Sequence, residues 1–426
     1  MAEPLCVACI GMGWWSDVLA DAVKRSGKLK IVACYTRSEE KRQVFAKKYG
    51  CRAAPSYEAV LTDAEVEAII NTTPNDVHLA TTRMAAEAGK HIFLDKPIAN
   101  SVSDGRKITE CCKQAGVVLA MGYQRRRESH FRWIKRQIDA GVFGKLVNAE
   151  ANISRDRLGQ FDLRSWRSTA AGMPGGVMLQ IGIHYADVLD YLIGPIKAVS
   201  GHFVRLVLPG DNPDVASLIF EHENGALSTL NASYASASEY YLMNIYGKTA
   251  TAYYDLHHGL SLLKQGEKKA VAVPCEKNDT FVEELEEFAA AVRGGPKPEV
   301  GGHYATTSLA VVRAGILSVH RGQMEAGLSL GLKRGSVLRQ IVVPQALRVI
   351  LPPLTNQYLN LTKNSSLAVA IGYPDLVSVF AGTTLSQTGQ AIEIIGITMG
   401  VYLLISLVTS AIMSFYGWRL SRSLGA

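Results

Sequence analysis

The chain has 426 residues, of which 48% are hydrophobic and 19% are charged. This balance excludes an intrinsically disordered chain, and the length predicts about two or three domains, each large enough to bury a core. The net charge of +7 is modest. Because no basic run is interleaved with aromatic residues, we expect no nucleic-acid partner.

The seven cysteines show no spacing typical of a metal site or a disulfide framework, so we expect reduced thiols and no metal. Cys6 and Cys9 form a C-x-x-C on paper only, because residues three apart on a strand point to opposite faces. The start of the sequence lacks a basic region followed by a long apolar run. We therefore expect no signal peptide and a cytosolic location for the N-terminal part.

A glycine turn near the N-terminus predicts a dinucleotide site. An apolar run over residues 6–10 leads into Gly11 and Gly13, and a helical pattern follows. Gly11 would allow the tight turn, and Gly13 would let the backbone approach a pyrophosphate whose charge sits at the helix N-terminus. Ser16 takes the place of the third glycine and is small enough for close helix–strand packing. A plain glycine turn is the alternative.

The end of the second predicted strand, over residues 31–35, carries the signal for the type of cofactor. Thr36 and Arg37 occupy the tip, where an acidic residue would hold the ribose 2′-hydroxyl of NAD, and Arg42 follows in the next helix. Since a guanidinium suits a 2′-phosphate, NADP is favoured over NAD. Solvated surface arginines are the alternative.

Strand-like and helical patterns alternate through the first 121 residues. We expect further strands over 66–71, 91–94 and 117–121 and helices over 77–89 and 102–116. This alternation predicts a parallel, doubly wound sheet with its functional loops at the carboxyl ends of the strands. The chemically loaded loops are 72–78, 95–97 and 122–126.

From Gly144 to about Asp255 the pattern predicts a second domain with an antiparallel or mixed sheet. The expected strands are 147–153, 199–207, 216–222, 226–235, 240–246 and 249–255. A helix over 281–293 closes this domain, and a last helix begins near Tyr304. Arg155, Arg157 and Trp166 stand where a substrate could touch them, although ordinary loop residues are the alternative.

Two motifs give residues 4–312 a resemblance to the Gfo/Idh/MocA oxidoreductase family. Asp95-Lys96-Pro97 resembles its Glu-Lys-Pro motif, and residues 73–78 resemble its T-P-N-x-x-H loop. Residues 175–187, GGVMLQIGIHYAD, resemble G-G-x-x-x-D-x-G-x-H-x-x-D. The resemblance implies an NAD(P)-dependent oxidoreductase of sugars or polyols. A Rossmann domain would span 1–122, and an α/β substrate domain with an open, largely antiparallel sheet would span 123–312.

The resemblance also implies roles for single residues. Lys96 would lie beside the nicotinamide and hydrogen-bond the reacting hydroxyl, while His184 would act as general acid/base, roles that suit an ammonium and an imidazole. Further cofactor contacts are expected from Gly11, Gly13, Ser16, Thr36, Arg37, Thr73, Pro74, Asn75, His78, Asp95 and Pro97. Further substrate contacts are expected from Tyr123, Arg125, Arg155, Trp166 and Gln180. We also expect the enzyme part to form a homo-oligomer.

One residue departs from the family pattern. Gln180 stands where the family has an aspartate, one helical turn before His184 and on the same face. Gln180 can hydrogen-bond a substrate hydroxyl, but it cannot supply the negative charge that raises the basicity of a histidine. Either Asp187 or a substrate group compensates, or the catalytic power is reduced.

The sequence changes character after residue 312. Residues 394–418 contain no charged side chain and are long enough to cross a bilayer, with a very hydrophobic buried helix as the alternative. Residues 322–344 resemble the coupling motif E-A-A-x3-G-x9-I-x-L-P of ABC transporter permeases. Residues 344–353 and 364–376 resemble the branch that takes up polar amino acids.

This second resemblance implies an all-α permease fragment over 313–426, with residues 322–344 docking on an ABC ATPase subunit. A second, interrupted span over 342–371 would return the chain to the cytosol. We therefore expect the inner membrane with a cytoplasmic oxidoreductase part, and a cytoplasmic protein is the alternative. Three functions stay open: an oxidoreductase with a membrane anchor, a component of an amino-acid ABC importer, and a non-physiological fusion of two genes.

Overall fold

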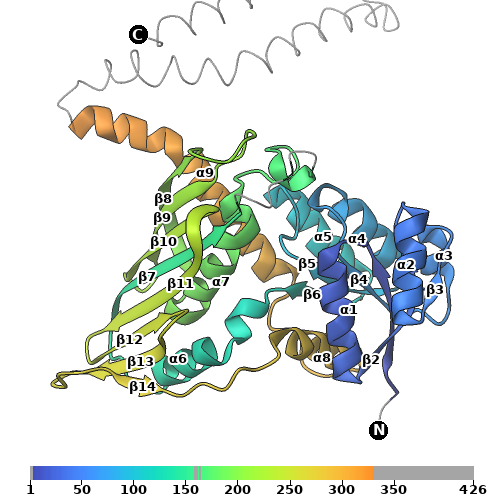
Figure 1. Ribbon diagram of the computed structural model, residues 1–426, viewed down its shortest axis with the longest axis horizontal. Coiled ribbons are helices and arrows are strands. Elements are labelled where there is room, and N and C mark those ends of the chain that lie inside the picture. Colours follow the sequence, from blue (N-terminus) through green and yellow to red (C-terminus); the bar gives the residue numbers. More distant parts are fainter. Residues whose placement is uncertain (1–2, 158–161, 163–164, 330–426) are drawn as a thin grey trace, which may run out of the picture. The chain divides into compact units, whose positions relative to one another are not determined.

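The computed structural model describes residues 3–157, 162 and 165–329. The chain divides into two compact units, residues 1–319 and 320–426. The first unit contains two β-sheets with their helices (Figure 1). The predicted membrane spans, and the predicted coupling segment beyond residue 329, lie outside the described residues. In the described part of the chain, no helix is both long and apolar enough to cross a membrane.

The first sheet is the predicted doubly wound parallel sheet. Its order is β3-β2-β1-β4-β5-β6, and all of its neighbouring strands are parallel. The strands are β1 (Leu5–Ile10), β2 (Leu29–Tyr35), β3 (Arg52–Ala53), β4 (Ala68–Asn71), β5 (His91–Asp95) and β6 (Leu119–Gly122). The order reverses between β1 and β4, which places the switch point of the sheet beside the glycine turn that follows β1.

Helices cover both faces of this sheet, as the continuously apolar strands require. One face is covered by α1 (Trp14–Ser26), α2 (Glu39–Tyr49) and α8 (Thr280–Val292), and the other by α3 (Tyr57–Thr62), α4 (His78–Glu87) and α5 (Val102–Gln114). Cys6 packs toward the second face and Cys9 lies in the core of the first, so the predicted divergence of the two thiols is confirmed. All seven cysteines are free.

The second sheet has eight strands in the order β14-β13-β12-β11-β7-β10-β9-β8. The pair β7–β10 is parallel and the other neighbours are antiparallel, so the prediction of a largely antiparallel, mixed sheet is confirmed. The strands are β7 (Leu146–Asp156), β8 (Ile196–Val204), β9 (Val215–His222), β10 (Leu227–Ser233), β11 (Ala235–Gly247), β12 (Ala250–Asp255), β13 (Gly259–Lys264) and β14 (Val271–Val273). The last two strands were not predicted.

The other α-helices of the described residues are α6 (Ser129–Asp139), α7 (Ile183–Ile193) and α9 (Gly302–Ser329). Helices α6 and α7 pack together, and α7 also packs on β7 and β10. The last described helix, α9, buries Leu309 and Val312 completely and packs Ile316 against the same core. The packed face of α9 therefore continues past residue 312. The predicted domain boundaries and the predicted homo-oligomer stay predictions.

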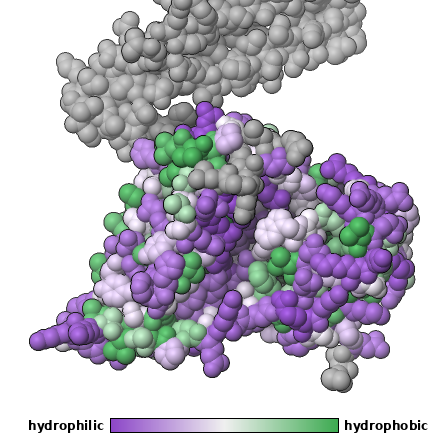
Figure 2. All heavy atoms as spheres, viewed as in Figure 1, coloured by the Kyte–Doolittle hydropathy of each residue, from purple (hydrophilic) through white to green (hydrophobic). Residues whose placement is uncertain are grey.

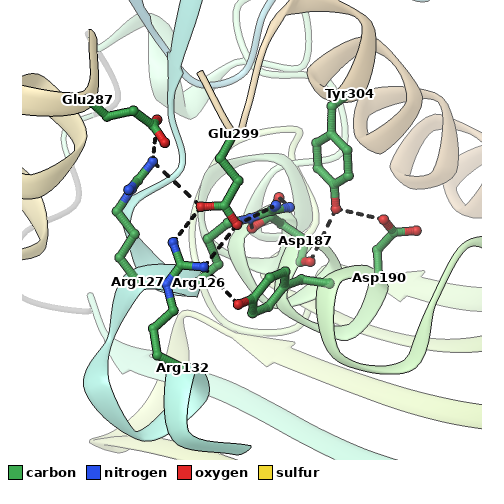
Figure 3. Close-up of polar contacts among 9 residues, drawn as sticks. Arg126, Arg127, Arg132, Asp187, Asp190, Glu287, Glu299 and Tyr304 are labelled. Carbon is green, nitrogen blue, oxygen red and sulfur yellow. Dashed lines mark hydrogen bonds and ion pairs between the residues drawn. The ribbon is translucent and has the colours of Figure 1, made fainter. Parts of the chain in front are cut away.

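A buried network of charges fastens α7 to the segments around it (Figure 3). Both nitrogens at one edge of the Arg126 guanidinium bond the Asp187 carboxylate, with Nη2–Oδ1 at 2.6 Å and Nε–Oδ2 at 3.0 Å. Arg126 is 3% exposed and Asp187 is fully buried. Glu299, before α9, contacts Arg126 and also binds Arg132 of α6. The Tyr304 hydroxyl donates to Asp190 of α7 at 2.6 Å.

We predict that Asp187→Asn lowers the free energy of unfolding by about 3 kcal/mol, because the buried Arg126 charge loses its principal partner. The measurement is urea unfolding of the full chain followed by circular dichroism. The matched control is Glu221→Gln, which breaks the exposed pair with Lys197 at 3.1 Å and is expected to cost less than about 1 kcal/mol. Equal losses in the two variants would contradict a stabilising role for the buried pair.

Candidate functional site

A cleft of about 350 Å³ lies at the ends of the first sheet's strands and is closed on its other side by the second sheet and its loops. Residues on the first side are Trp14, Trp15, Thr73, Asn75, Asp95 and Lys96, and those on the second include Arg155, Arg157, Trp166, Arg167, Gln180, His184 and Tyr234. Hydrophilic residues cover most of the face shown in Figure 2, including the region between the two sheets. The cleft thus joins segments that are far apart in the sequence.

The glycine turn has the geometry that a dinucleotide needs. Gly11 has φ +85°, and a Cβ there would lie 2.7 Å from the backbone nitrogen of Thr73, so both its conformation and the close approach of the β4 loop require glycine. A Cβ on Gly13 would meet no atom within 4 Å, which leaves open space in front of the N-terminus of α1. The Ser16 hydroxyl bonds the backbone of Gly13, with its oxygen accepting at 3.1 Å and donating at 2.7 Å.

Lys96 follows β5 and spans the cleft. Its Nζ donates to the backbone carbonyl of Gln180 at 2.6 Å. Burial lowers the pKa of Lys96 to about 8, and the nearby Arg167, Arg155 and Arg125 act in the same direction, while Asp95 opposes them. The ammonium is therefore charged at neutral pH but close to its titration range.

His184, near the start of α7, lies in the same cleft and is 6% exposed. Its Nδ1 is buried and has no hydrogen-bond partner among the described residues. Burial, followed by the charges of Lys96, Arg125 and Arg155, lowers its pKa well below 6.5. The imidazole is thus neutral at pH 7 and able to accept a proton.

Gln180 lies in a π-helical turn, Met178–Gly182, rather than in the predicted α-helical turn before His184. Both residues nevertheless line the cleft. The Gln180 amide is held on both sides, since Nε2 donates to the carbonyl of Arg167 and Oε1 accepts from the Tyr234 hydroxyl, each at 2.7 Å. Such π-helical turns are frequent at functional sites.

Asp187 does not compensate for the neutral Gln180, which corrects one of the sequence-based alternatives. Its carboxylate is committed to Arg126, and it makes no contribution to the pKa of His184. The other two alternatives, a substrate group and a reduced catalytic power, stay open.

Some of the predicted cofactor residues line the cleft and the others do not. Thr73, Asn75, Asp95 and Lys96 line it, as expected for cofactor contacts. His78 corrects the prediction: it is fully buried, with Nε2 at 2.9 Å from the Thr73 carbonyl and Nδ1 at 3.1 Å from the Pro97 carbonyl. It therefore holds two loops together. The other cofactor residues outside the cleft lining are Gly11, Gly13, Ser16, Thr36, Arg37, Pro74 and Pro97.

The predicted substrate residues also separate. Arg125, Arg155 and Trp166 line the cleft, together with Gln180 and His184. Tyr123 does not, because its ring is 1% exposed and lies edge-on to the His184 ring at a centroid distance of 6.3 Å. Gln124, in the predicted loop 122–126, also lines the cleft, whereas the sequence did not indicate Trp14, Trp15, Arg167 and Tyr234. Arg167 adjoins the predicted Trp166, but only the fold brings Tyr234, at the end of β10, to this place.

The first part of the chain matches two models of one family. Residues 5–123 match the oxidoreductase family with an NAD-binding Rossmann fold, and residues 131–253 match the GFO/IDH/MocA C-terminal domain. The scyllo-inositol 2-dehydrogenase (NAD(+)) of Bacillus subtilis is 30% identical over 62% of this chain and 78% of its own length. A solved structure described as an NADPH-dependent oxidoreductase of Desulfitobacterium hafniense has a TM-score of 0.72 at 33% identity, covering 76% of this chain and 97% of the other.

The last part matches a different model. Residues 301–422 match the binding-protein-dependent transport system inner membrane component. An amino-acid ABC transporter permease protein of Escherichia coli is 63% identical over 26% of this chain and 28% of its own length. The chain spans about a quarter of the length of the permeases that it matches. The two sequence-based resemblances are thus confirmed, and through residues 5–253 the chain belongs to the Gfo/Idh/MocA oxidoreductase family.

Proposed function

We propose that this protein is an NAD(P)-dependent oxidoreductase that transfers hydride between a nicotinamide and a CH–OH group of a sugar, a polyol or a related hydroxy compound. The observation that carries the proposal is the shared cleft of Lys96 and His184, whose lining includes Trp14 and Trp15, the residues that directly follow the glycine turn. The scyllo-inositol dehydrogenase among the relatives supports a polyhydroxylated substrate.

The residues of the cleft fit a dinucleotide. The open space at Gly13 and the N-terminus of α1 would take the pyrophosphate. Thr73, Asn75 and Lys96 would face the nicotinamide half. When bound, the nicotinamide supplies the hydride acceptor or donor, and all other steps fall to groups of the chain.

Proton transfer falls to His184. Its neutral imidazole would take the hydroxyl proton of the substrate during oxidation and return it during reduction. The Lys96 ammonium would hydrogen-bond the same oxygen and stabilise the negative charge that develops as the proton leaves. Lys96 is aimed by its bond to the Gln180 carbonyl, which comes from the second sheet's side of the cleft.

We also propose a preference for NADP over NAD. The support is the exposed Arg37 at the end of β2 and the hydrogen bond from Arg42 to the Thr36 carbonyl at 3.1 Å, which keeps a second guanidinium near this strand end. The relative described as NADPH-dependent agrees with this choice.

For the last part of the chain we propose attachment to the inner membrane, with the oxidoreductase part on the cytoplasmic side. The support is the match of residues 301–422 to an inner-membrane transport component. Residues 322–344 would offer a docking segment to an ABC ATPase subunit. Because the chain spans about a quarter of the length of the matched permeases, we propose an anchor rather than a transport pathway.

Lys96→Ala is predicted to lower kcat by about 10²- to 10³-fold, because the developing alkoxide loses its donor. NADPH binding should change only a few-fold, and Lys113→Ala, an exposed lysine on α5, serves as the control.

In the native protein kcat/KM for oxidation should fall above about pH 8, where Lys96 loses its charge. In Lys96→Arg this alkaline limb should disappear, since a guanidinium stays protonated. An unchanged limb would contradict the role of Lys96.

Titration of the full chain with NADPH and NADH, followed by nicotinamide fluorescence, tests the cofactor directly. We expect the lower Kd for NADPH. Arg37→Ala should weaken NADPH binding about tenfold through loss of a charge-assisted contact and should leave NADH within about twofold. Arg106→Ala, exposed on α5, is the matched control. If the chain binds neither NADPH nor NADH, the proposed oxidoreductase function is refuted.

The membrane proposal predicts that the full chain sediments with membranes and needs detergent for its release. Alkaline carbonate washing of the membrane fraction, followed by immunoblotting, is the measurement. A chain ending at residue 319, the end of the first compact unit, is the comparison and should stay in the supernatant. Recovery of the full chain in the supernatant would refute membrane insertion.

A further inference from the structure

The charge of the cleft is unbalanced. Its lining contains five cationic side chains, Lys96, Arg125, Arg155, Arg157 and Arg167. Among the described lining residues the carboxylates are Asp95 and Asp162. Burial raises the pKa of Asp95, which weakens its contribution as a counter-charge near neutral pH.

The partners of these cations lie largely outside the lining. Arg125 pairs with Glu128 at 2.8 Å, and Nε of Arg155 lies 3.3 Å from Glu239 and 2.8 Å from the Tyr241 hydroxyl. Neither glutamate belongs to the lining. The Arg167 guanidinium lies over the Trp166 ring, 4.4 Å from its centroid, and Asp95 is the carboxylate whose charge acts on it.

The positive charge converges on the reacting groups. Arg125 and Arg155 act on both Lys96 and His184, and Arg167 acts on Lys96, in each case lowering the pKa. Gln180 is neutral, and one N–H of its side-chain amide already donates to the Arg167 carbonyl. Among the described residues that line the cleft, cations therefore outnumber carboxylates near the place where the substrate hydroxyl would react.

We propose, on the basis of the function proposed above, that the substrate carries an anionic group, a carboxylate or a phosphate ester, which binds to Arg155 and Arg167. Guanidinium groups suit both anions because of their planar, forked donor geometry. The anion would also stabilise the imidazolium that forms on His184 when the hydroxyl proton is transferred. Specificity for charged substrates would follow from the arginines and from the neutrality of Gln180 together.

The test compares matched substrates on the full chain in detergent with the preferred nucleotide. The probes are D-glucose, D-glucuronate and D-glucose 6-phosphate, with the corresponding galactose and mannose series. We expect kcat/KM of an anionic member to exceed that of its neutral partner by about tenfold or more, as one charge-assisted contact allows. The uronate and phosphate arms identify which anion the cleft takes.

Variants assign the preference to the arginines. In Arg167→Gln and in Arg155→Gln, the ratio of kcat/KM between the anionic and the neutral member should fall about tenfold or more. Arg136→Gln, an exposed arginine of α6 outside the cleft, should leave the ratio unchanged. Gln180→Glu places a carboxylate among the cations and should also lower the ratio, whereas Gln180→Asn keeps the site neutral and should preserve it.

A binding measurement keeps the proposal separate from the proposed chemistry. Binding of the same probes, with and without NADPH, is followed through the fluorescence of Trp14, Trp15 and Trp166, which line the cleft. If the chain binds no nucleotide but binds the anionic probe more tightly than its neutral partner, the proposed oxidoreductase is refuted and the anion site is retained. The anion site is overturned if no anionic probe binds or reacts better than its neutral partner. The absence of any binding counts as this outcome too.

Discussion

The hydrogen bond from Nζ of Lys96 to the backbone carbonyl of Gln180, 2.6 Å long, is the contact on which the site depends. It joins the loop after β5 of the first sheet to the π-helical turn before α7, on the side of the second sheet. A π-helical turn interrupts the regular ladder of helical hydrogen bonds, and here the carbonyl of that turn accepts a bond from a side chain. The acid/base candidate His184 follows directly on the same segment. The positions of Lys96 and His184 are therefore set by one local arrangement.

This arrangement in turn needs a rigid α7. The buried pair of Arg126 and Asp187, with Glu299 beside it, fastens that helix to the segments before α6 and α9. Burying these charges is costly unless each one is paired, so loss of one partner would leave an uncompensated charge in the core. The price of this rigidity is that Asp187 is committed to Arg126 and cannot serve His184. The cleft keeps its positive charge as a result.

Helix α9 lies where the match to the inner-membrane transport component begins. Helix α9 begins at Gly302, packs Leu309 and Val312 into the core of the first unit, and still contacts this core at Ile316. Gly315 is also buried, so the packed face of the helix continues after position 312. The core of the first unit therefore includes residues that belong to the match with the transport component.

Much of the fold could be predicted from local patterns. The apolar runs at β1, β4 and β5 and the glycine turn at Gly11 determine a parallel sheet with a dinucleotide turn, since burial on both faces and a positive φ leave few alternatives. The short strands β13 and β14 were missed, although Leu260 and Leu262 alternate and are buried in β13; β14 has three residues, is largely exposed and pairs with β13. The motifs around Lys96 and His184 likewise indicated the chemistry of the site.

Tertiary structure alone decided which of the indicated residues face one another. The sequence determined that His78 and Asp187 belong to the motifs and that Tyr123 lies in a neighbouring loop, but packing turned these residues away from the cleft into hydrogen bonds, an ion pair and an aromatic contact. It also brought Tyr234 and Arg167 to the two sides of the Gln180 amide. Sequence patterns register periodicity and residue type, whereas the direction of a side chain depends on distant segments that compete for its hydrogen bonds. For this reason the chemistry of the cleft could be inferred from the chain, and its charge balance could not.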